Sequence, residues 1–169
     1  HEVVARVRAM FKGGLPAKHN LDLNELVGET LKLGQPSIQA GKINVEFRLD
    51  SSCPPVFGDR VQLQQVILNL VTNAIEAMNN NGEDPSILRL HTWLDGTSVV
   101  LTVSDTGPEI DPDIVDKFFA PLFTTKSQGM GMGLSISRAI VQAHGGSLTA
   151  RPQKPRGLEL QMILPSAGK

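Results

Sequence analysis

Two long stretches of the chain repeat apolar residues with the period of a helix. The first runs from Asn24, which is placed to cap it, to about Gln39, and it ends near Gly41. The second begins after Asp59, also a suitable cap, and carries an apolar and a polar stripe on opposite sides. The apolar stripe, which we expect to be buried, consists of Leu63, Ile67, Leu70, Ala74 and Ala77, and the polar stripe of Gln62, Gln65, Asn69, Asn73 and Glu76.

Shorter helical patterns lie towards both ends. The first dozen residues place Val3, Val7 and Met10 on one face, like the end of a longer helix. Because so short a helix is only marginally stable alone, this stripe needs a partner, which is either its own domain or another chain. A helical turn is expected at residues 111–117, and a helix from 133 to 144. The residues that this last helix should bury are Ile136, Ala139, Ile140 and Ala143.

Five segments alternate apolar and polar residues in the manner of strands, namely 43–49, 87–94, 98–104, 147–151 and 158–164. Asp95-Gly96 separates the second from the third and is typical of a two-residue type I′ hairpin turn. The order of these elements predicts an α+β fold, a two-layer α/β sandwich. Its mixed, mostly antiparallel sheet should carry helices on one face.

The composition fits one domain, since 40% of the 169 residues are hydrophobic. Sixteen basic and seventeen acidic residues give a net charge of -1, which offers no general attraction for nucleic acid. The single cysteine, Cys53, has no partner for a disulfide, and we interpret it as inert. No apolar run approaches the length of a membrane span and no signal peptide is recognised, so we expect a cytoplasmic chain whose parent is soluble or membrane-anchored.

A nucleotide pocket is indicated by two features that follow each other in the chain. Asp105 comes at the end of a strand, where a carboxylate can accept a hydrogen bond from an exocyclic amino group. The glycine ladder at residues 129–133 opens a helix, where backbone N–H groups can approach phosphate oxygens. Asn69 and Asn73 lie upstream on a polar stripe that would otherwise be interpreted as a solvated face. The irregular residues 118–132 between the two features are interpreted as a mobile lid.

This ordered set resembles the catalytic, ATP-binding domain of sensor histidine kinases, in the GHKL or Bergerat-fold superfamily. Within that superfamily, the chain resembles the nitrogen- and oxygen-sensing kinase branch. The resemblance rests on an N box at 64–77, a G1 box at 105–110, an F box at 118–123, a G2 box at 129–134 and a weaker final motif at Gly157-Leu158.

The resemblance implies ATP and Mg²⁺ as cofactors. Asp105 would receive the adenine amino group, Asn73 would be the metal ligand, and Asn69 would lie beside it or face the phosphates. Lys126 is expected to contact the γ-phosphate, although a solvated loop lysine is the alternative. Asn69 and Lys126 are the expected catalytic residues. The expected nucleotide-binding residues are Asn69, Asn73, Glu76, Ala77, Asp105, Gly107, Ile110, Phe119, Thr124, Thr125, Lys126, Gly129, Gly131, Met132, Gly133 and Leu134.

Asn69 favours phosphoryl transfer over hydrolysis, because ATPase branches carry a glutamate there and an amide cannot act as a general base. A GHKL-type ATPase nevertheless stays open as an alternative, as does a serine kinase of the anti-sigma type. Three positions depart from the family pattern: Glu109, Glu76 and Leu122. Glu109 places a charged side chain where the G1 box usually has a glycine, and Glu76 replaces the lysine of many family members and so removes a cation for the phosphates. A degenerate interaction module is therefore a further alternative.

None of the four histidines resembles a phosphoacceptor; these are His1, His19, His91 and His144. We therefore expect a fragment that cannot phosphorylate itself, whose partners are the phosphoacceptor helix of its parent kinase and a response-regulator receiver domain. The parent should be a homodimer and this chain a monomer. The predicted segments are a helix remnant at 1–14, a linker at 15–20, the catalytic domain at 21–165 and a tail at 166–169.

Overall fold

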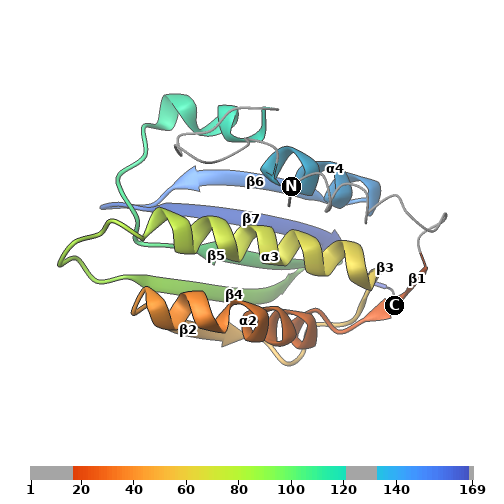
Figure 1. Ribbon diagram of the computed structural model, residues 1–169. Coiled ribbons are helices and arrows are strands. Elements are labelled where there is room, and N and C mark those ends of the chain that lie inside the picture. Colours follow the sequence, from red (N-terminus) through yellow and green to blue (C-terminus); the bar gives the residue numbers. More distant parts are fainter. Residues whose placement is uncertain (1–16, 121–132, 168–169) are drawn as a thin grey trace.

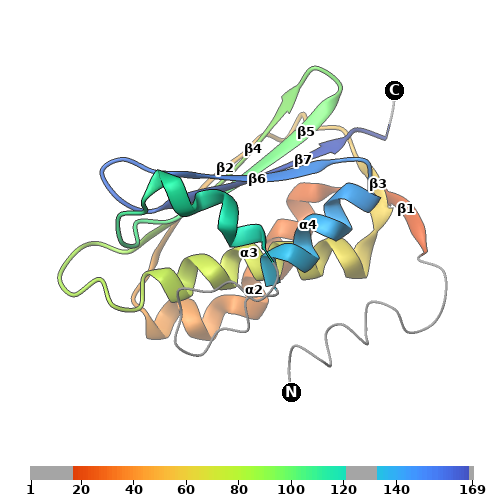
Figure 2. The ribbon, with the colours of Figure 1, turned by 90° about the horizontal axis from the view of Figure 1, so that it is seen from above.

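The computed structural model describes residues 17–120 and 133–167. The whole of the predicted helix remnant, 1–14, and residues 121–132 of the predicted lid therefore lie outside the described part of the chain. Within it, three α-helices cover one face of a five-stranded sheet (Figures 1 and 2). This arrangement confirms the predicted α+β, two-layer architecture.

The main sheet has the strand order β2-β4-β5-β7-β6. Only β2 and β4 are parallel to each other; the other neighbours are antiparallel. The bounds of these strands are β2 Asn44–Leu49, β4 Ile87–Asp95, β5 Ser98–Ser104, β6 Ser147–Pro152 and β7 Leu158–Pro165. A crossover helix joins the two parallel strands, as parallel pairing requires.

A second, two-stranded sheet pairs β1, Lys18–Leu21, with β3, Val56–Asp59, in antiparallel register. The sequence pattern does not predict either strand. Both are four residues long, and three of the four β1 residues are exposed, so no apolar alternation marks them. Part of the segment predicted to be a linker therefore forms regular structure.

Helix α2 spans Leu23–Ala40 and is capped by Asp22, whose Oδ1 accepts hydrogen bonds from the backbone N–H groups of Asn24 and Glu25. The prediction that Asn24 is the cap is wrong. The Asn24 amide instead donates to the Asp50 carbonyl at 2.9 Å and accepts from the Thr92 hydroxyl at 2.8 Å. Asn24 therefore links the start of α2 to the sheet.

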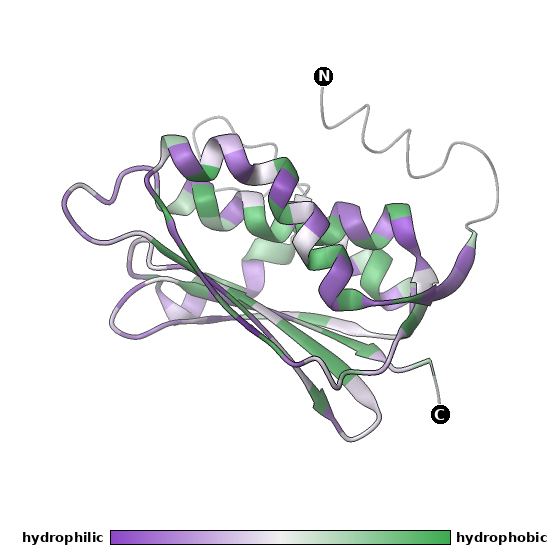
Figure 3. Cartoon of the chain, turned by 90° about the horizontal axis from the view of Figure 1, so that it is seen from below, coloured by the Kyte–Doolittle hydropathy of each residue, from purple (hydrophilic) through white to green (hydrophobic). Residues whose placement is uncertain are grey.

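Helix α3, Arg60–Ala77, begins at the predicted cap, where Asp59 Oδ1 accepts from the Gln62 N–H at 2.9 Å. Its predicted apolar stripe is buried, except that Ala77 at its end is half-buried. Together with α2 and the inward side of the sheet it forms one hydrophobic core, visible as apolar segments between the layers (Figure 3). None of the helices in the described residues is long and apolar enough to span a bilayer.

Helix α4, Gly133–Ala143, ends in a Schellman motif, in which Gly146 N–H bonds to the Val141 carbonyl and Gly145 N–H to the Gln142 carbonyl. The prediction that Ala139 and Ala143 are buried is wrong, because both are exposed. Ile140 is buried as predicted and Ile136 is half-buried, and the buried face also carries Ser137 and Val141. An alanine gives little indication of which side of a helix is covered.

Two further segments refine the predictions. A 3₁₀-helix, η1, spans Pro112–Phe119 and is capped by Asp111, close to the predicted turn. The β4–β5 loop consists of Gly96 and Thr97, because Asp95 pairs with Ser98. Gly96 has φ +63°, whereas Lys42 is the one non-glycine with positive φ among the described residues. The predicted type I′ turn is therefore wrong, since it needs positive φ at both loop positions; glycine at the first fits type II′.

His144 joins the end of α4 to the start of α3. Its ring is buried, Nδ1 lies 2.8 Å from the Ile140 carbonyl, and Nε2 accepts from the Asp59 N–H at 3.1 Å. These contacts define the neutral tautomer with the proton on Nδ1. A Cβ at Gly58 would lie 2.7 Å from His144 Cδ2, so the strand before α3 can approach this ring only with a glycine. These contacts give His144 a structural role.

Replacement of His144 by phenylalanine is expected to lower the free energy of unfolding by about 1–3 kcal/mol, because the Asp59 N–H and the Ile140 carbonyl lose their ring partner. Urea denaturation measures the change. His91→Phe is the matched control, since a phenyl ring can keep the contact of His91 with Trp93, whose ring centroid lies 4.4 Å away. Equal losses in the two variants would contradict a specific role for His144.

Candidate nucleotide-binding site

The carboxylate of Asp105 is held in place where β5 ends. The residue is 6% exposed, and its Oδ1 accepts from the N–H groups of Gly107 at 2.8 Å and Leu158 at 3.3 Å. The Asp105 N–H in turn donates to the Leu158 carbonyl at 3.0 Å. Two backbone donors and the neighbouring strand β7 therefore fix the direction of this side chain before any ligand arrives.

Two glycines make this arrangement sterically feasible. A Cβ at Gly107 would lie 2.9 Å from the Ala77 carbonyl, so the turn after Asp105 packs directly on the last residue of α3. Gly157 has φ +101°, and a Cβ there would lie 2.0 Å from the Asp105 carbonyl oxygen. Glycine is thus required at both positions for close backbone approach. The structure brings together Asp105, Gly107 and Ala77, three of the residues predicted to bind the nucleotide.

Asn69 connects α3 to the first turn of α4. It is 5% exposed, and its Nδ2 lies 3.1 Å from Ser137 Oγ and 3.4 Å from the Gly133 carbonyl. Its Oδ1 accepts from Gln65 Nε2 at 3.4 Å. The polar stripe of α3 is therefore not simply a solvated face at this position. The same stripe continues to Asn73, which is half-buried, and ends at the exposed Glu76.

Only part of the predicted lid and glycine ladder falls within the described residues. Gly133 and Leu134 begin α4 and are half-buried. Phe119 is buried at the end of η1, and the Arg138 guanidinium lies 4.0 Å from the centroid of its ring. Ile110 is half-buried between β5 and η1. The predicted residues outside the described part are Thr124, Thr125, Lys126, Gly129, Gly131 and Met132.

The donor set near Asn69 and Asn73 suits a weakly held hard cation rather than a closed metal site. In residues 17–120 and 133–167, no group of three or more His, Cys, Asp or Glu side chains could hold a metal ion. Amide oxygens are hard ligands, and Mg²⁺ commonly takes one or two protein oxygens together with phosphate oxygens and water. The residues present therefore fit a cation that a nucleotide brings with it.

Ser137 and Arg156 are site residues that the sequence reasoning missed. Ser137 accepts from the Asn69 amide, and Arg156 Nε donates to the Gly107 carbonyl at 2.7 Å. Arg156 immediately precedes Gly157 of the final glycine motif, which is the one signal that could have drawn attention to it. Cys53 lies outside this group, and burial raises the pKa of its thiol, in agreement with an inert, protonated cysteine.

Comparison with known proteins agrees with this geometry. A family model described as histidine kinase-, DNA gyrase B-, and HSP90-like ATPase matches residues 58–168. The chain is 35% identical over 166 residues to the sensor protein FixL of Bradyrhizobium diazoefficiens, covering 98% of this chain and 33% of FixL. It is 34% identical over 163 residues to the C4-dicarboxylate transport sensor protein DctS of Rhodobacter capsulatus, covering 96% of this chain and 25% of DctS. The chain thus spans a third or less of the length of either relative.

Solved structures extend the likeness to three dimensions. The catalytic domain of the histidine kinase ThkA, in a nucleotide-free form, matches with a TM-score of 0.78 and 32% identity, covering 89% of this chain and 98% of that chain. ThkA in complex with the response regulator TrrA matches with a TM-score of 0.81 and 29% identity, covering 98% of this chain and 47% of that chain.

Gly107→Ala is expected to weaken the binding of Mg²⁺-ATP by about tenfold or more, because relieving a contact of this kind costs about 1–3 kcal/mol and moves the turn after Asp105. Titration calorimetry measures the affinity. Gly28→Ala is the matched control, since a Cβ at Gly28 on α2 would have no neighbour within 4 Å. Unchanged affinity in Gly107→Ala would show that the turn does not need its close approach to Ala77.

Proposed function

This chain belongs to the family of histidine kinase-, DNA gyrase B- and HSP90-like ATPases, and we propose that it binds Mg²⁺-ATP and donates the γ-phosphate to a histidine side chain. It is the catalytic ATP-binding domain of a two-component sensor histidine kinase. The acceptor histidine would lie on a separate helical segment of the parent protein.

The observation that carries the proposal is the buried, oriented carboxylate of Asp105 beside Gly107. Because Asp105 accepts two backbone hydrogen bonds at Oδ1, its orientation is determined without a ligand. A carboxylate in this position would accept a hydrogen bond from the exocyclic amino group of adenine. Guanine carries a carbonyl oxygen at that place, so Asp105 would favour ATP over GTP.

The phosphates would lie towards the start of α4, where Asn69 contacts Gly133 and Ser137. Backbone N–H groups at a helix N-terminus favour phosphate oxygens. In this proposal Asn73 supplies an oxygen to Mg²⁺, and Lys126 contacts the γ-phosphate. Bound Mg²⁺ would neutralise part of the phosphate charge, while Asn73 and Lys126 orient the triphosphate for transfer.

Asn69 supports transfer rather than hydrolysis as the reaction. An amide cannot accept a proton from water at neutral pH, so this side chain would not act as the general base of an ATPase. Its engagement with Ser137 and Gln65 indicates that it positions groups instead. A GHKL-type ATPase is the second candidate, and brisk steady-state release of phosphate would favour it.

The degenerate-module alternative rests on Glu109 and Glu76. Both residues are exposed, so neither side chain is buried in the space beside Asp105. This exposure supports an intact nucleotide pocket. The packing of Leu26 and Val27 of α2 into the core likewise supports a catalytic domain that includes residues 21–57, before the start of the family match.

A response-regulator receiver domain is the proposed downstream partner, receiving the phosphate from the acceptor histidine on one of its carboxylates. ThkA, which is 29% identical to this chain in that comparison, was crystallised with the response regulator TrrA. The parent is proposed to be a homodimer of cytoplasmic kinase domains, with this chain alone as a monomer.

Asp105→Asn is expected to reduce the affinity for Mg²⁺-ATP by about tenfold to a hundredfold, because a hydrogen bond to a charged acceptor is worth about 1.5–3 kcal/mol. Affinity for Mg²⁺-GTP should stay low in both forms. Titration calorimetry with each nucleotide measures this, with Asp95→Asn at the exposed β4–β5 turn as the control. A native chain that binds neither nucleotide would refute the proposal.

The isolated chain is expected to incorporate no label from γ-labelled ATP, because none of its histidines resembles a phosphoacceptor. When the helical acceptor segment of the parent kinase is added, label should appear on that segment. Phosphoamino-acid analysis under alkaline conditions identifies phosphohistidine. Labelling of the isolated chain would contradict the proposal that acceptor and catalytic domain are separate.

A further inference from the structure

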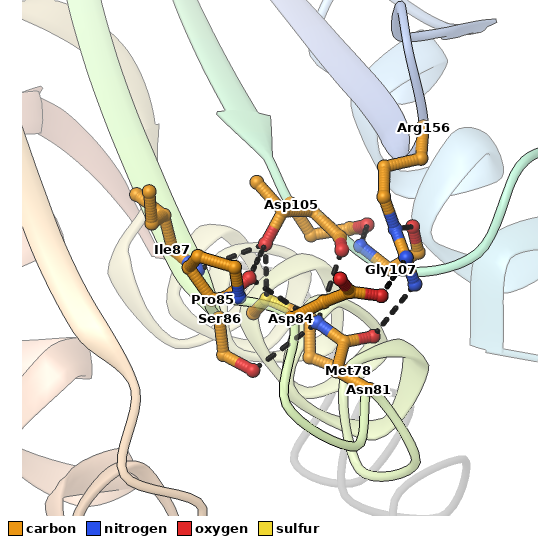
Figure 4. Close-up of polar contacts among 10 residues, drawn as sticks. Met78, Asn81, Asp84, Pro85, Ser86, Ile87, Asp105, Gly107 and Arg156 are labelled. Carbon is orange, nitrogen blue, oxygen red and sulfur yellow. Dashed lines mark hydrogen bonds and ion pairs between the residues drawn. The ribbon is translucent and has the colours of Figure 1, made fainter.

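Three segments that are distant in sequence meet at the turn after Asp105 (Figure 4). Asn81 and Asp84 lie in the loop between α3 and β4, Thr106 and Gly107 form the turn, and Arg156 lies in the loop between β6 and β7. We call these five residues the Arg156 cluster. None of its polar side chains is among the residues that the sequence predicts for nucleotide binding.

Arg156 contacts three partners in the cluster. Its Nε donates to the Gly107 carbonyl at 2.7 Å, one terminal nitrogen donates to Asn81 Oδ1 at 3.1 Å, and the other forms an ion pair with Asp84. The side chain is 31% exposed, which shields these contacts in part from water. A planar guanidinium can make all three contacts at once because its donors point in fixed, divergent directions.

Asn81 holds the other carbonyl of the turn. It is 8% exposed, and its Nδ2 donates to the Thr106 carbonyl at 3.0 Å. The Thr106 hydroxyl donates to the Pro85 carbonyl at 2.7 Å and accepts from the Ile87 N–H at 3.0 Å. The two residues that follow Asp105 are therefore both fixed by side chains, and Arg156 contacts Asn81 as well as Gly107.

An open cleft of about 330 Å³ borders Asp105, Thr106 and Arg156 and extends to Arg89 and Gln153. The position of the turn therefore depends on the polar contacts of the Arg156 cluster, on the approach of Gly107 to Ala77 and on the contact of the Thr106 hydroxyl with Met78 Sδ at 3.6 Å. The Gly157 N–H adds a hydrogen bond to the Pro108 carbonyl at 3.2 Å. Loss of the guanidinium would leave the Gly107 carbonyl without this donor and widen the cleft.

We propose that Arg156 is a positioning residue for recognition of the nucleotide base. By holding the Gly107 carbonyl, it keeps the Gly107 N–H directed at Asp105 Oδ1 and so keeps the carboxylate oriented for the base. This inference rests on the proposed function, in which Asp105 receives adenine. It assigns the β6–β7 loop a part in base recognition, whereas Asn69 and α4 serve the phosphates.

The test compares two probes that share a triphosphate but differ in the base. Arg156→Ala should weaken the binding of Mg²⁺-ATP by about tenfold, the effect expected for one charged hydrogen bond. Binding of Mg²⁺-tripolyphosphate, which has no base, should change by less than about twofold. Equal weakening of the two probes, or no weakening of ATP binding, would overturn the proposal.

Two variants control for charge and for loss of packing. Arg151→Ala removes an exposed arginine of the neighbouring strand β6 that pairs with Glu159 at 2.9 Å, and it should leave ATP binding unchanged. Arg156→Lys keeps the charge beside Asp84, but one ammonium lacks the fork that serves Gly107 and Asn81 together. Arg156→Lys should therefore bind ATP more weakly than the native chain. On a logarithmic scale, its affinity should lie no higher than midway between those of Arg156→Ala and the native chain.

A nucleotide-free measurement separates failure of this inference from failure of the proposed function. Amide hydrogen exchange of Gly107 should accelerate in Arg156→Ala, while exchange in α3 stays as in the native chain. If the native chain binds no nucleotide, the proposed function fails. The exchange of Gly107 then still tests whether Arg156 holds the turn after Asp105. If Gly107 exchange is the same with and without the guanidinium, Arg156 does not hold the turn.

Discussion

Burial of α3 between the sheet and its two neighbouring helices is the constraint on which the site depends. Leu63, Ile67 and Leu70 are fully buried, so this helix can neither rotate nor slide without exposing core side chains. Its position places Ala77 against Gly107 at one end and Asn69 against α4 in the middle. Hydrophobic packing therefore sets the distance between the part of the site that would hold a base and the part that would hold phosphates.

Polar contacts fix the positions of α4 and of the turn after Asp105, which hydrophobic packing alone does not determine. His144 and Asn69 attach α4 to α3 near the two ends of α4, so the short helix lies along the longer one in one register. Arg156 and Asn81 do the same for the turn after Asp105, by bonding to the carbonyl groups of Gly107 and Thr106. In both places a buried or half-buried side chain satisfies a backbone group that would otherwise be costly to leave unpaired.

Helices and strands whose apolar residues repeat regularly could be predicted from the sequence. So could the candidate site residues that belong to a short sequence motif. The helices, the five main strands, Asp105 and the glycines at 107 and 157 all leave such a signal. The errors have physical causes: Asn24 and Asp22 are both good caps, and tertiary contacts with Asp50 and Thr92 recruit Asn24 elsewhere. Alanines at 139 and 143 do not mark a face, and β1 and β3 are too short to alternate. Arg156 and Asn81 are 75 residues apart, and no local pattern joins them.

The two halves of the candidate site, the start of α4 and the turn after Asp105, are held by different kinds of interaction and therefore differ in how easily substitutions can change them. The start of α4 is attached to a core helix, so changing its position would require repacking residues such as Ile140 and Val141. The turn after Asp105 is held by loop side chains next to an open cleft, where substitution disturbs little of the core. If the site binds the nucleotide as proposed, substitutions in the α3–β4 and β6–β7 loops would alter recognition of the base and leave the framework for the phosphates unchanged.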